Sequence, residues 1–268
     1  MYICFSVFIK GGKSMPATVI SFSLQKGGVG KTTTSTLAAF LLSQKGYRVL
    51  AIDMDSQANM TQVLSDSDDV KQFKGTTIRE AMLDRENFKS YIRIVNDHLH
   101  YVPADDYVVL LSDYQGEVPR DELLIAALVN VLDEYDFVII DTPPNLGTQT
   151  LNALMASDHV VVMFETAKYA YNAIDRFLET INSVRKYGNE ELNILGILAT
   201  LSDARRSDNK ELLELVQEEY GDLIFNTVIP RRAAIGRIPV YGLYDNPELK
   251  AATEHHAKFI EEVLTRVN

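Results

Sequence analysis

Residues 25–33 combine three glycines, two lysines and two threonines in the order Gln-Lys-Gly-Gly-Val-Gly-Lys-Thr-Thr. Glycines let a backbone curl so that successive N–H groups point at one ligand, and proteins cradle phosphate oxygens in this way. Lys31 can reach the β and γ phosphates of a nucleotide, and the Thr32 hydroxyl can ligate Mg²⁺. We therefore predict a nucleotide-binding loop composed of Gly27, Gly28, Val29, Gly30, Lys31, Thr32 and Thr33.

This loop departs from the strict phosphate-loop pattern G-x-x-x-x-G-K-[ST] at one position. Gln25 stands where the first glycine belongs, and a second lysine, Lys26, follows it at the mouth of the loop. A second ammonium group is therefore expected beside a site that binds phosphates.

Carboxylates follow two other apolar runs. Asp53 and Asp55 lie in the segment 51–59, directly after one run, and Asp141 ends the run Phe-Val-Ile-Ile-Asp at 137–141. A carboxylate at the carboxyl end of a parallel strand lies in the ligand crevice of an open α/β sheet. We predict that Asp141 holds Mg²⁺ directly or through a water molecule. For Asp53 and Asp55, the simpler alternative is that two acids merely end a strand.

The elements that must position these residues alternate between strand and helix. Alternation of this kind predicts an α/β fold with a mostly parallel, twisted sheet and helices on both faces. Short apolar runs predict strands at 18–24, 48–52, 137–140, 160–164, 194–200 and 223–229. Segments of helical period predict helices at 33–44, 123–135, 172–187, 210–220 and 247–267.

Composition limits the class of protein. The chain has 268 residues, of which 46% are hydrophobic and 24% charged, and these are ordinary values for a globular protein. A single cysteine excludes a disulfide framework and any iron–sulfur or zinc site built from cysteines of this chain alone. No run approaches the roughly 20 apolar residues of a membrane span, so we expect a cytoplasmic protein without a membrane partner. We interpret residues 1–14 as an appendage or upstream start, residues 15–268 as one domain, and the polar stretch 65–74 as a solvated loop.

Together these motifs resemble the deviant Walker A box of the ParA/MinD family of P-loop ATPases, and most closely the Soj-like ParA partition ATPases. The resemblance extends from Met15 nearly to the C-terminus. It implies ATP and Mg²⁺ as cofactors. It also implies that Lys26 reaches across a nucleotide-sandwich homodimer to the phosphates of the partner, which would offset the repulsion between two facing nucleotides. Lys26, Lys31 and Asp55 are thus the predicted catalytic residues.

The resemblance assigns roles to the remaining motif residues. It places Asp53 and Asp55 in switch I, where Asp55 orients the attacking water, and it implies that switch II passes a change at the γ-phosphate to the dimer face. Ser56 stands where the family usually has proline. The switch residues are Asp53, Thr142, Pro143 and Pro144, and Pro230 packs on adenine. The preference for ATP over GTP rests on the resemblance alone.

The chain has two arginine clusters, at 205–206 and at 231–237, although its net charge is −11. In partition ATPases, basic residues after the corresponding strands form a non-specific DNA-binding face of the ATP dimer, and contacts of this kind are steeply salt-dependent. For any single arginine a solvated surface is the alternative, and Ala234 and Arg237 replace the family's usual arginine and glutamate. The candidate DNA-binding residues are Arg205, Arg206, Arg231, Arg232 and Arg237.

The resemblance therefore implies a DNA partition ATPase that associates with the nucleoid when ATP is bound. A ParB-like centromere-binding adaptor would stimulate its slow hydrolysis. Two alternatives share the loop: a MinD-like positioning ATPase, which would end in a basic amphipathic helix, and a metabolic P-loop ATPase or ligase, which would not need two arginine clusters. The last eight residues include Glu261 and Glu262, which suit a packed helix better than a membrane-binding one.

Overall fold

The computed structural model describes residues 16–166, 170–201, 207–238, 242–243 and 247–267. The predicted appendage 1–14 lies outside these residues. A seven-stranded sheet with the order β3-β4-β2-β5-β1-β6-β7 forms the centre of the described part, and every neighbouring pair is parallel except β3 with β4. The strands are β1 (Thr18–Ser23), β2 (Val49–Asp53), β3 (Arg93–Asn96), β4 (Leu99–Val102), β5 (Phe137–Asp141), β6 (His159–Glu165) and β7 (Asn193–Thr200).

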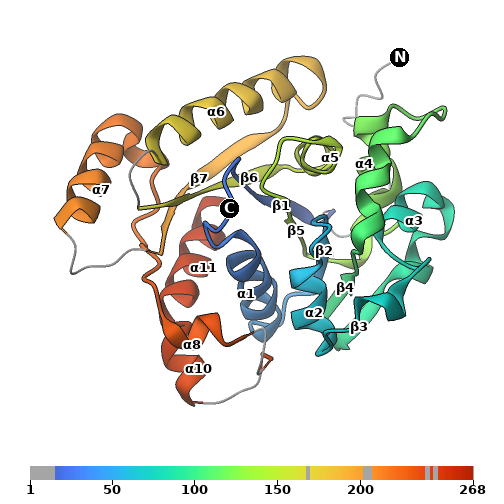
Figure 1. Cartoon of the computed structure of the whole chain (residues 1–268), viewed down its shortest axis with the longest axis horizontal. Coiled ribbons are helices and arrows are strands. Elements are labelled where there is room, and N and C mark those ends of the chain that lie inside the picture. The colour runs from blue at the N-terminus through green and yellow to red at the C-terminus, as the bar shows by residue number, and fades with distance from the viewer. Residues whose placement is uncertain (1–15, 167–169, 202–206, 239–241, 244–246, 268) are drawn as a thin grey trace.

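Helices cover both faces of this sheet, as the sequence predicts (Figure 1). Helices α1 and α11 pack on one face, and α4, α5 and α6 lie on the other. The α-helices are α1 (Lys31–Gln44), α2 (Asn59–Ser65), α3 (Ile78–Leu83), α4 (Leu123–Leu128), α5 (Thr148–Met155), α6 (Ala170–Tyr187), α7 (Ser207–Tyr220), α8 (Ala233–Gly236), α10 (Pro247–Ala252) and α11 (Glu254–Val267). Short 3₁₀ helices are η2 (Val70–Phe73), η3 (Arg85–Tyr91), η4 (Asp106–Asp113), η5 (Arg120–Glu122), η6 (Leu132–Glu134) and η7 (Gly221–Leu223).

The central strands are apolar on both sides because both sides are covered. Along β1, Phe22 belongs to the core cluster shared with α1 and α11, whereas Val19 belongs to the cluster shared with α3 and α4. The rings of Phe22 and Phe259 of α11 meet edge to face, with centroids 6.2 Å apart. Strands buried in this way are typical of parallel sheets and give continuous hydrophobic runs in the sequence.

Three strands bring the predicted site residues to one edge. In the parallel register, Asp141 at the end of β5 pairs with Phe22 of β1 and with Asp53 at the end of β2. The carboxyl ends of β1, β2 and β5 therefore meet where α1 begins.

Several predicted elements differ from the observed ones. The predicted strand 223–229 is wrong. The segment makes an isolated bridge from Ile224 to Ile197, and its Phe225 and Ile229 N–H groups donate to β7. Between these two contacts the N–H groups of Asn226 and Thr227 donate to Glu262 of α11 instead, which interrupts the pairing. The predicted helix 123–135 ends as an α-helix at Leu128, and the predicted helix 247–267 is divided at Thr253.

The stretch 65–74 is not simply a solvated loop. Its last turn, η2, buries Phe73, whose ring lies edge to face with Tyr101, at 6.3 Å between centroids. Strands β3 and β4 were not predicted. Each has four residues, too few for a clear periodic signal in the sequence. No helix within the described residues has the length and apolar character needed to cross a membrane.

Candidate nucleotide-binding site

The glycine-rich loop connects β1 to α1 with the conformation that a phosphate-binding loop needs. Gly28 and Gly30 have φ angles of 74° and 81°, in the left-handed region where a Cβ atom causes strain. Gly30 is the N-cap of α1, so the free N–H groups at the start of a 14-residue helix face the loop. Anions bind at such helix starts because the N–H groups and the helix dipole both favour negative charge.

Lys31 is folded into this loop. Its side chain is buried, and its ammonium donates to the carbonyl oxygens of Lys26 at 2.9 Å and Leu24 at 3.3 Å. Burial lowers the pKa of Lys31, and the nearby carboxylates of Asp141 and Asp55 oppose that shift. The loop thus holds a cation at its centre in a place where phosphate oxygens would be attracted.

Asp141 has the features of a residue that holds a divalent cation. Its carboxyl group is completely buried, and Oδ1 accepts a hydrogen bond from the Ser35 hydroxyl at 3.0 Å. Its other oxygen, Oδ2, has no hydrogen-bond partner among the described residues. Burial, followed by the neighbouring carboxyl of Asp53, raises the pKa of Asp141. The Thr32 hydroxyl, in the first turn of α1, opposes that shift. This oxygen-rich pair fits Mg²⁺.

Asp53 serves a different purpose from Asp141. One oxygen accepts from the Thr61 N–H at 2.9 Å and the Thr61 hydroxyl at 2.8 Å, and the other accepts from the Asp55 N–H at 3.0 Å. Burial raises the pKa of Asp53 in spite of these hydrogen bonds. Asp53 therefore fixes the turn that carries Asp55 to the start of α2, rather than offering a free oxygen to a ligand.

Asp55 is held close to the loop by this turn. It is buried, and its Oδ1 accepts from the backbone N–H of Gln57 at 3.0 Å. Its charge is also one of the two that raise the pKa of Lys31. A carboxylate beside the phosphate-binding ammonium can accept a proton from a water molecule in the same crevice.

The segment after β5 contacts the loop from the other side. The Thr142 hydroxyl is buried and lies 2.8 Å from both the Phe22 carbonyl oxygen and the Ser23 hydroxyl. Pro143 is also buried, whereas Pro144 is exposed. A Cβ atom on Gly27 would lie 3.9 Å from the Cβ atom of Pro144. Thr142 thus anchors this segment to β1 while Pro144 lies against the loop.

Comparison with known proteins agrees with this geometry. The family model described as "AAA domain" matches residues 17–194. The sporulation initiation inhibitor protein Soj of Bacillus subtilis is 35% identical over 237 residues, which are 85% of this chain and 91% of that protein. The chain belongs to the Soj/ParA family. The chromosome-partitioning ATPase Soj of Thermus thermophilus is 34% identical over 92% of this chain and 96% of that protein.

Solved structures extend the comparison to ligands. Cobyrinic acid a,c-diamide synthase from Mycobacterium smegmatis, with a bound ATP analogue and magnesium, matches with a TM-score of 0.78 at 28% identity, over 94% of this chain and 96% of that one. A plasmid partition protein from Borrelia burgdorferi matches with a TM-score of 0.73 at 27% identity, over 94% of this chain and 97% of that one. The mostly parallel α/β fold of this Soj/ParA chain is therefore that of P-loop NTPases of the ParA/MinD type.

Pro230, which is predicted to pack on adenine, lies farther along this edge. Ile229 donates its N–H to Ala199 of β7 at 2.9 Å, which places the half-buried Pro230 beside the end of that strand. The next residue of β7, Thr200, bonds through its hydroxyl to the Val29 carbonyl oxygen of the loop at 2.6 Å. Pro230 thus lies beside the end of β7, the strand whose last residue contacts the loop of this Soj/ParA protein.

The arginines are only partly described. Arg231 and Arg232 are exposed directly after Pro230. Arg237 pairs with Glu248 of α10. Arg205 and Arg206 lie outside the described residues, so the prediction that the two clusters share one face stays a prediction.

Sequence reasoning missed four residues of this site: Ser35, Thr61, Thr200 and Glu165, the last of which pairs with Lys26 at 3.3 Å. Thr200 ends an apolar strand in the same manner as Asp53 and Asp141, and that position is a signal that could have found it. Ser35 lies one helical turn after Lys31, at the spacing that places two residues on one face of a helix.

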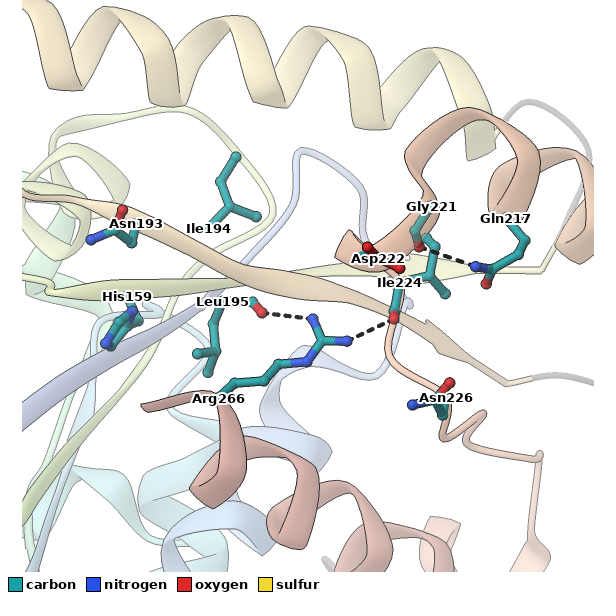
Figure 2. A pocket seen from close by; sticks show the side chains of 10 residues that line it. All are labelled: His159, Asn193, Ile194, Leu195, Gln217, Gly221, Asp222, Ile224, Asn226 and Arg266. Atoms are coloured by element: carbon teal, nitrogen blue, oxygen red, sulfur yellow. Dashed lines mark hydrogen bonds between the residues drawn. The ribbon is translucent and has the colours of Figure 1, made fainter. Parts of the chain in front are cut away.

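A cavity at the other edge of the sheet contains none of the predicted site residues. Figure 2 shows this cavity, of about 590 Å³, at the amino ends of β6 and β7. Arg266 of α11 crosses it and donates to the carbonyl oxygens of Leu195 at 2.9 Å and Ile224 at 2.7 Å. Its guanidinium group therefore ties α11 to β7, so we place the candidate site at the loop and not in this cavity.

Replacing Asp141 by asparagine should stabilise the protein when Mg²⁺ and nucleotide are absent. Burial raises the pKa of Asp141 to about 8, whereas an unfolded carboxyl group titrates near 4. Ionisation of Asp141 therefore removes stability progressively as the pH rises from about 4 to about 8. The melting temperature of Asp141→Asn, relative to the parent, should increase by a few degrees over this range. Thermal denaturation in chelator-treated buffers measures it.

The matched control for this experiment is Asp136→Asn. The hydrogen bond from Arg48 lowers the pKa of Asp136, so the effect should have the opposite sign: a lower melting temperature near neutral pH, with the difference shrinking in acid. If Asp141→Asn is less stable than the parent at pH 8 without Mg²⁺, the buried carboxylate does not carry the unfavourable charge that we assign to it.

Proposed function

We propose that this protein is a DNA partition ATPase that hydrolyses ATP to ADP and phosphate with Mg²⁺ and acts as an ATP-bound homodimer. The observation that carries the proposal is the arrangement of Lys31 and Asp141: a buried ammonium in a glycine loop stands close to a buried carboxylate, one oxygen of which has no hydrogen-bond partner in the described part of the chain. Relatives that include chromosome-partitioning ATPases support the partition role. We place the protein in the cytoplasm, on the nucleoid when ATP is bound.

The chain's own residues divide the work of hydrolysis. The loop N–H groups and Lys31 bind phosphate oxygens, and Thr32 and Asp141 hold the metal ion directly or through water. When bound there, Mg²⁺ would supply positive charge that offsets the negative charge developing on the phosphate groups. Asp55 orients the attacking water, and Lys26 acts from one subunit on the nucleotide of the other. A change at the γ-phosphate reaches the dimer face through Thr142, Pro143 and Pro144.

We also propose that hydrolysis is slow until a partner protein intervenes. The three motif segments 25–33, 51–59 and 137–145 contain no arginine that could serve as a finger. An arginine finger accelerates phosphoryl transfer by roughly 10³–10⁵. A ParB-like adaptor, together with DNA, is the partner that we expect to stimulate turnover and to end the DNA-bound state.

The double variant Arg231→Ala with Arg232→Ala should weaken binding to random-sequence duplex DNA. Both residues are exposed, and a dimer presents each of them twice. Each lost phosphate contact should reduce the slope of log affinity against log salt by roughly one. The measurement is a fluorescence titration over a series of salt concentrations, at saturating ATP so that parent and variant are both dimeric.

The control removes two exposed lysines elsewhere, with Lys71→Ala and Lys74→Ala. It changes the net charge equally but should leave the salt slope unchanged. If the arginine variant binds as tightly as the parent at every salt concentration, these arginines do not contact DNA.

A metabolic ATPase or ligase is the second candidate. The structural likeness to cobyrinic acid a,c-diamide synthase favours it, because that enzyme has the same fold with an ATP analogue and magnesium. ATP-dependent DNA binding distinguishes the partition function from the metabolic one. A parent protein that shows no ATP-dependent affinity for DNA at low salt would favour the metabolic function over partition.

A further inference from the structure

Glu165 binds two cations that the proposed function uses for different purposes. It is the last residue of β6, and its Oε2 accepts from the ammonium of Lys26 at 3.3 Å. Its Oε1 accepts from the guanidinium of Arg231, also at 3.3 Å. One carboxylate therefore joins the lysine at the mouth of the loop to the first arginine of the candidate DNA-binding segment.

The place of Glu165 is fixed by the sheet. Glu165 pairs in register with Thr200 of β7, and the Thr200 hydroxyl contacts the carbonyl oxygens of Val29 and Phe164 at 2.6 and 2.9 Å. The carboxylate thus projects from a strand end that is itself bonded to the nucleotide loop. Lys26 and Arg231, by contrast, lie on segments outside the sheet strands.

The environment of the three groups makes this contact more than a loose surface pair. The side chain of Glu165 is 24% exposed and that of Lys26 31%, whereas Arg231 is 64% exposed. The Glu165–Lys26 ion pair is partly shielded from water, so salt and solvent screen it less than they screen a fully exposed pair. Phosphate groups that bind either Lys26 or Arg231 must therefore displace the same carboxylate, that of Glu165.

We propose that Glu165 is a positioning residue that holds Lys26 on its own subunit and neutralises Arg231 until phosphate groups displace it. The inference rests on the proposed function, in which Lys26 acts across the dimer and Arg231 contacts DNA. Glu165 opposes both events. Removal of its charge should therefore favour dimerisation and DNA binding, even though no contact to nucleotide or DNA has been added.

The effect on dimerisation should be larger than one ion pair suggests. A partly exposed ion pair is worth a factor of about 2–5 in an equilibrium constant. Both subunits must move a Lys26 ammonium, so Glu165→Gln should raise the ATP-dependent dimerisation constant by about 4- to 25-fold. Its affinity for random-sequence DNA should rise as well, by a factor that disappears when Arg231→Ala is also present.

The first measurement is analytical ultracentrifugation of the parent and Glu165→Gln with ATP and Mg²⁺ over a range of protein concentrations. Lys26→Ala with Glu165→Gln should dimerise no better than Lys26→Ala alone, because the gain requires the lysine. Melting temperatures establish that each variant is folded. Weaker or unchanged dimerisation of folded Glu165→Gln would overturn the proposal.

A second measurement does not depend on the dimer. In the nucleotide-free protein, an amine-reactive reagent should modify Lys26 about 2–5 times faster in Glu165→Gln than in the parent, since the amine is no longer engaged in the ion pair with Glu165. Lys210, whose side chain is 82% exposed, is the internal reference in the mass spectrum. Equal rates at Lys26 would overturn the proposal, whereas a parent that never dimerises with ATP would contradict the proposed function alone.

Discussion

Lys31→Ala should lose nucleotide binding at concentrations of Mg²⁺-ATP that saturate the parent protein. The ammonium of Lys31 is buried at the centre of the loop and already has its position, so no ordering of the side chain is needed when phosphates arrive. Truncating one partner of a buried, hydrogen-bonded charge pair costs about 2–5 kcal/mol. That range corresponds to a loss of affinity of roughly 30- to 4,000-fold. Isothermal titration calorimetry with a non-hydrolysable ATP analogue measures it.

The control for this variant is Lys45→Ala. Lys45 is the C-cap residue of the same helix and pairs with Glu261 of α11, so its removal changes the net charge equally at the far end of α1. Its nucleotide affinity should stay within about threefold of the parent, as expected for a surface ion pair. If Lys31→Ala also stays within that range, Lys31 is not the phosphate ligand and the glycine loop must bind through its N–H groups alone.

The sequence predicts the loop and the carboxylates because both depend on short spacings. The glycines, Lys31 and Thr32 are consecutive, and Asp53 and Asp141 each end an apolar run, so a parallel sheet places them at one edge. The register of β2 and β5, which pairs Asp53 with Asp141, confirms that edge. Five of the six predicted strands are confirmed on the same ground, since strands buried on both faces give unbroken apolar runs.

The supporting contacts could not be predicted, because their partners are distant in the chain. Ser35 meets Asp141 across 106 positions, and Thr200 meets the Val29 carbonyl across 171. Asp53 shows the same limit in another way. Its neighbours in sequence suggest a ligand-facing switch residue, yet Thr61 and the Asp55 N–H occupy its oxygens. Whether an aspartate binds a ligand or holds a turn depends on contacts that a linear pattern does not contain.

The wrong prediction of a strand at 223–229 has a comparable origin. The segment is apolar enough for a strand, and its Phe225 and Ile229 N–H groups donate to β7. The Thr227 N–H between them, which continued pairing would need, donates to Glu262 of α11 instead. Backbone groups satisfied by a side chain are not available to a neighbouring strand. This segment leads directly to Pro230 and Arg231, so its irregular path sets where the candidate adenine and DNA residues lie.

The second large effect is expected for Lys26→Ala, which should bind nucleotide but fail to dimerise with ATP. The ammonium of Lys26 pairs with Glu165, at 3.3 Å. Its backbone carbonyl, however, accepts from Lys31 at 2.9 Å, and the substitution leaves that contact in place. Nucleotide affinity should therefore change by less than about fivefold, the range for a partly exposed ion pair.

Dimerisation should respond far more strongly, because two nucleotides face each other across the proposed interface. Each carries several negative charges, and like charges within a low-dielectric interface repel one another by several kcal/mol unless cations lie between them. Lys26 supplies one such cation from each subunit.

Multi-angle light scattering with ATP and Mg²⁺ should give the monomer mass for Lys26→Ala at concentrations where the parent is dimeric. Lys210→Ala, which removes an exposed lysine of α7, should dimerise as the parent does. A Lys26→Ala protein with the dimer mass would mean that other groups neutralise the facing phosphates, and Lys26 would then be held by Glu165 for a purpose within its own subunit.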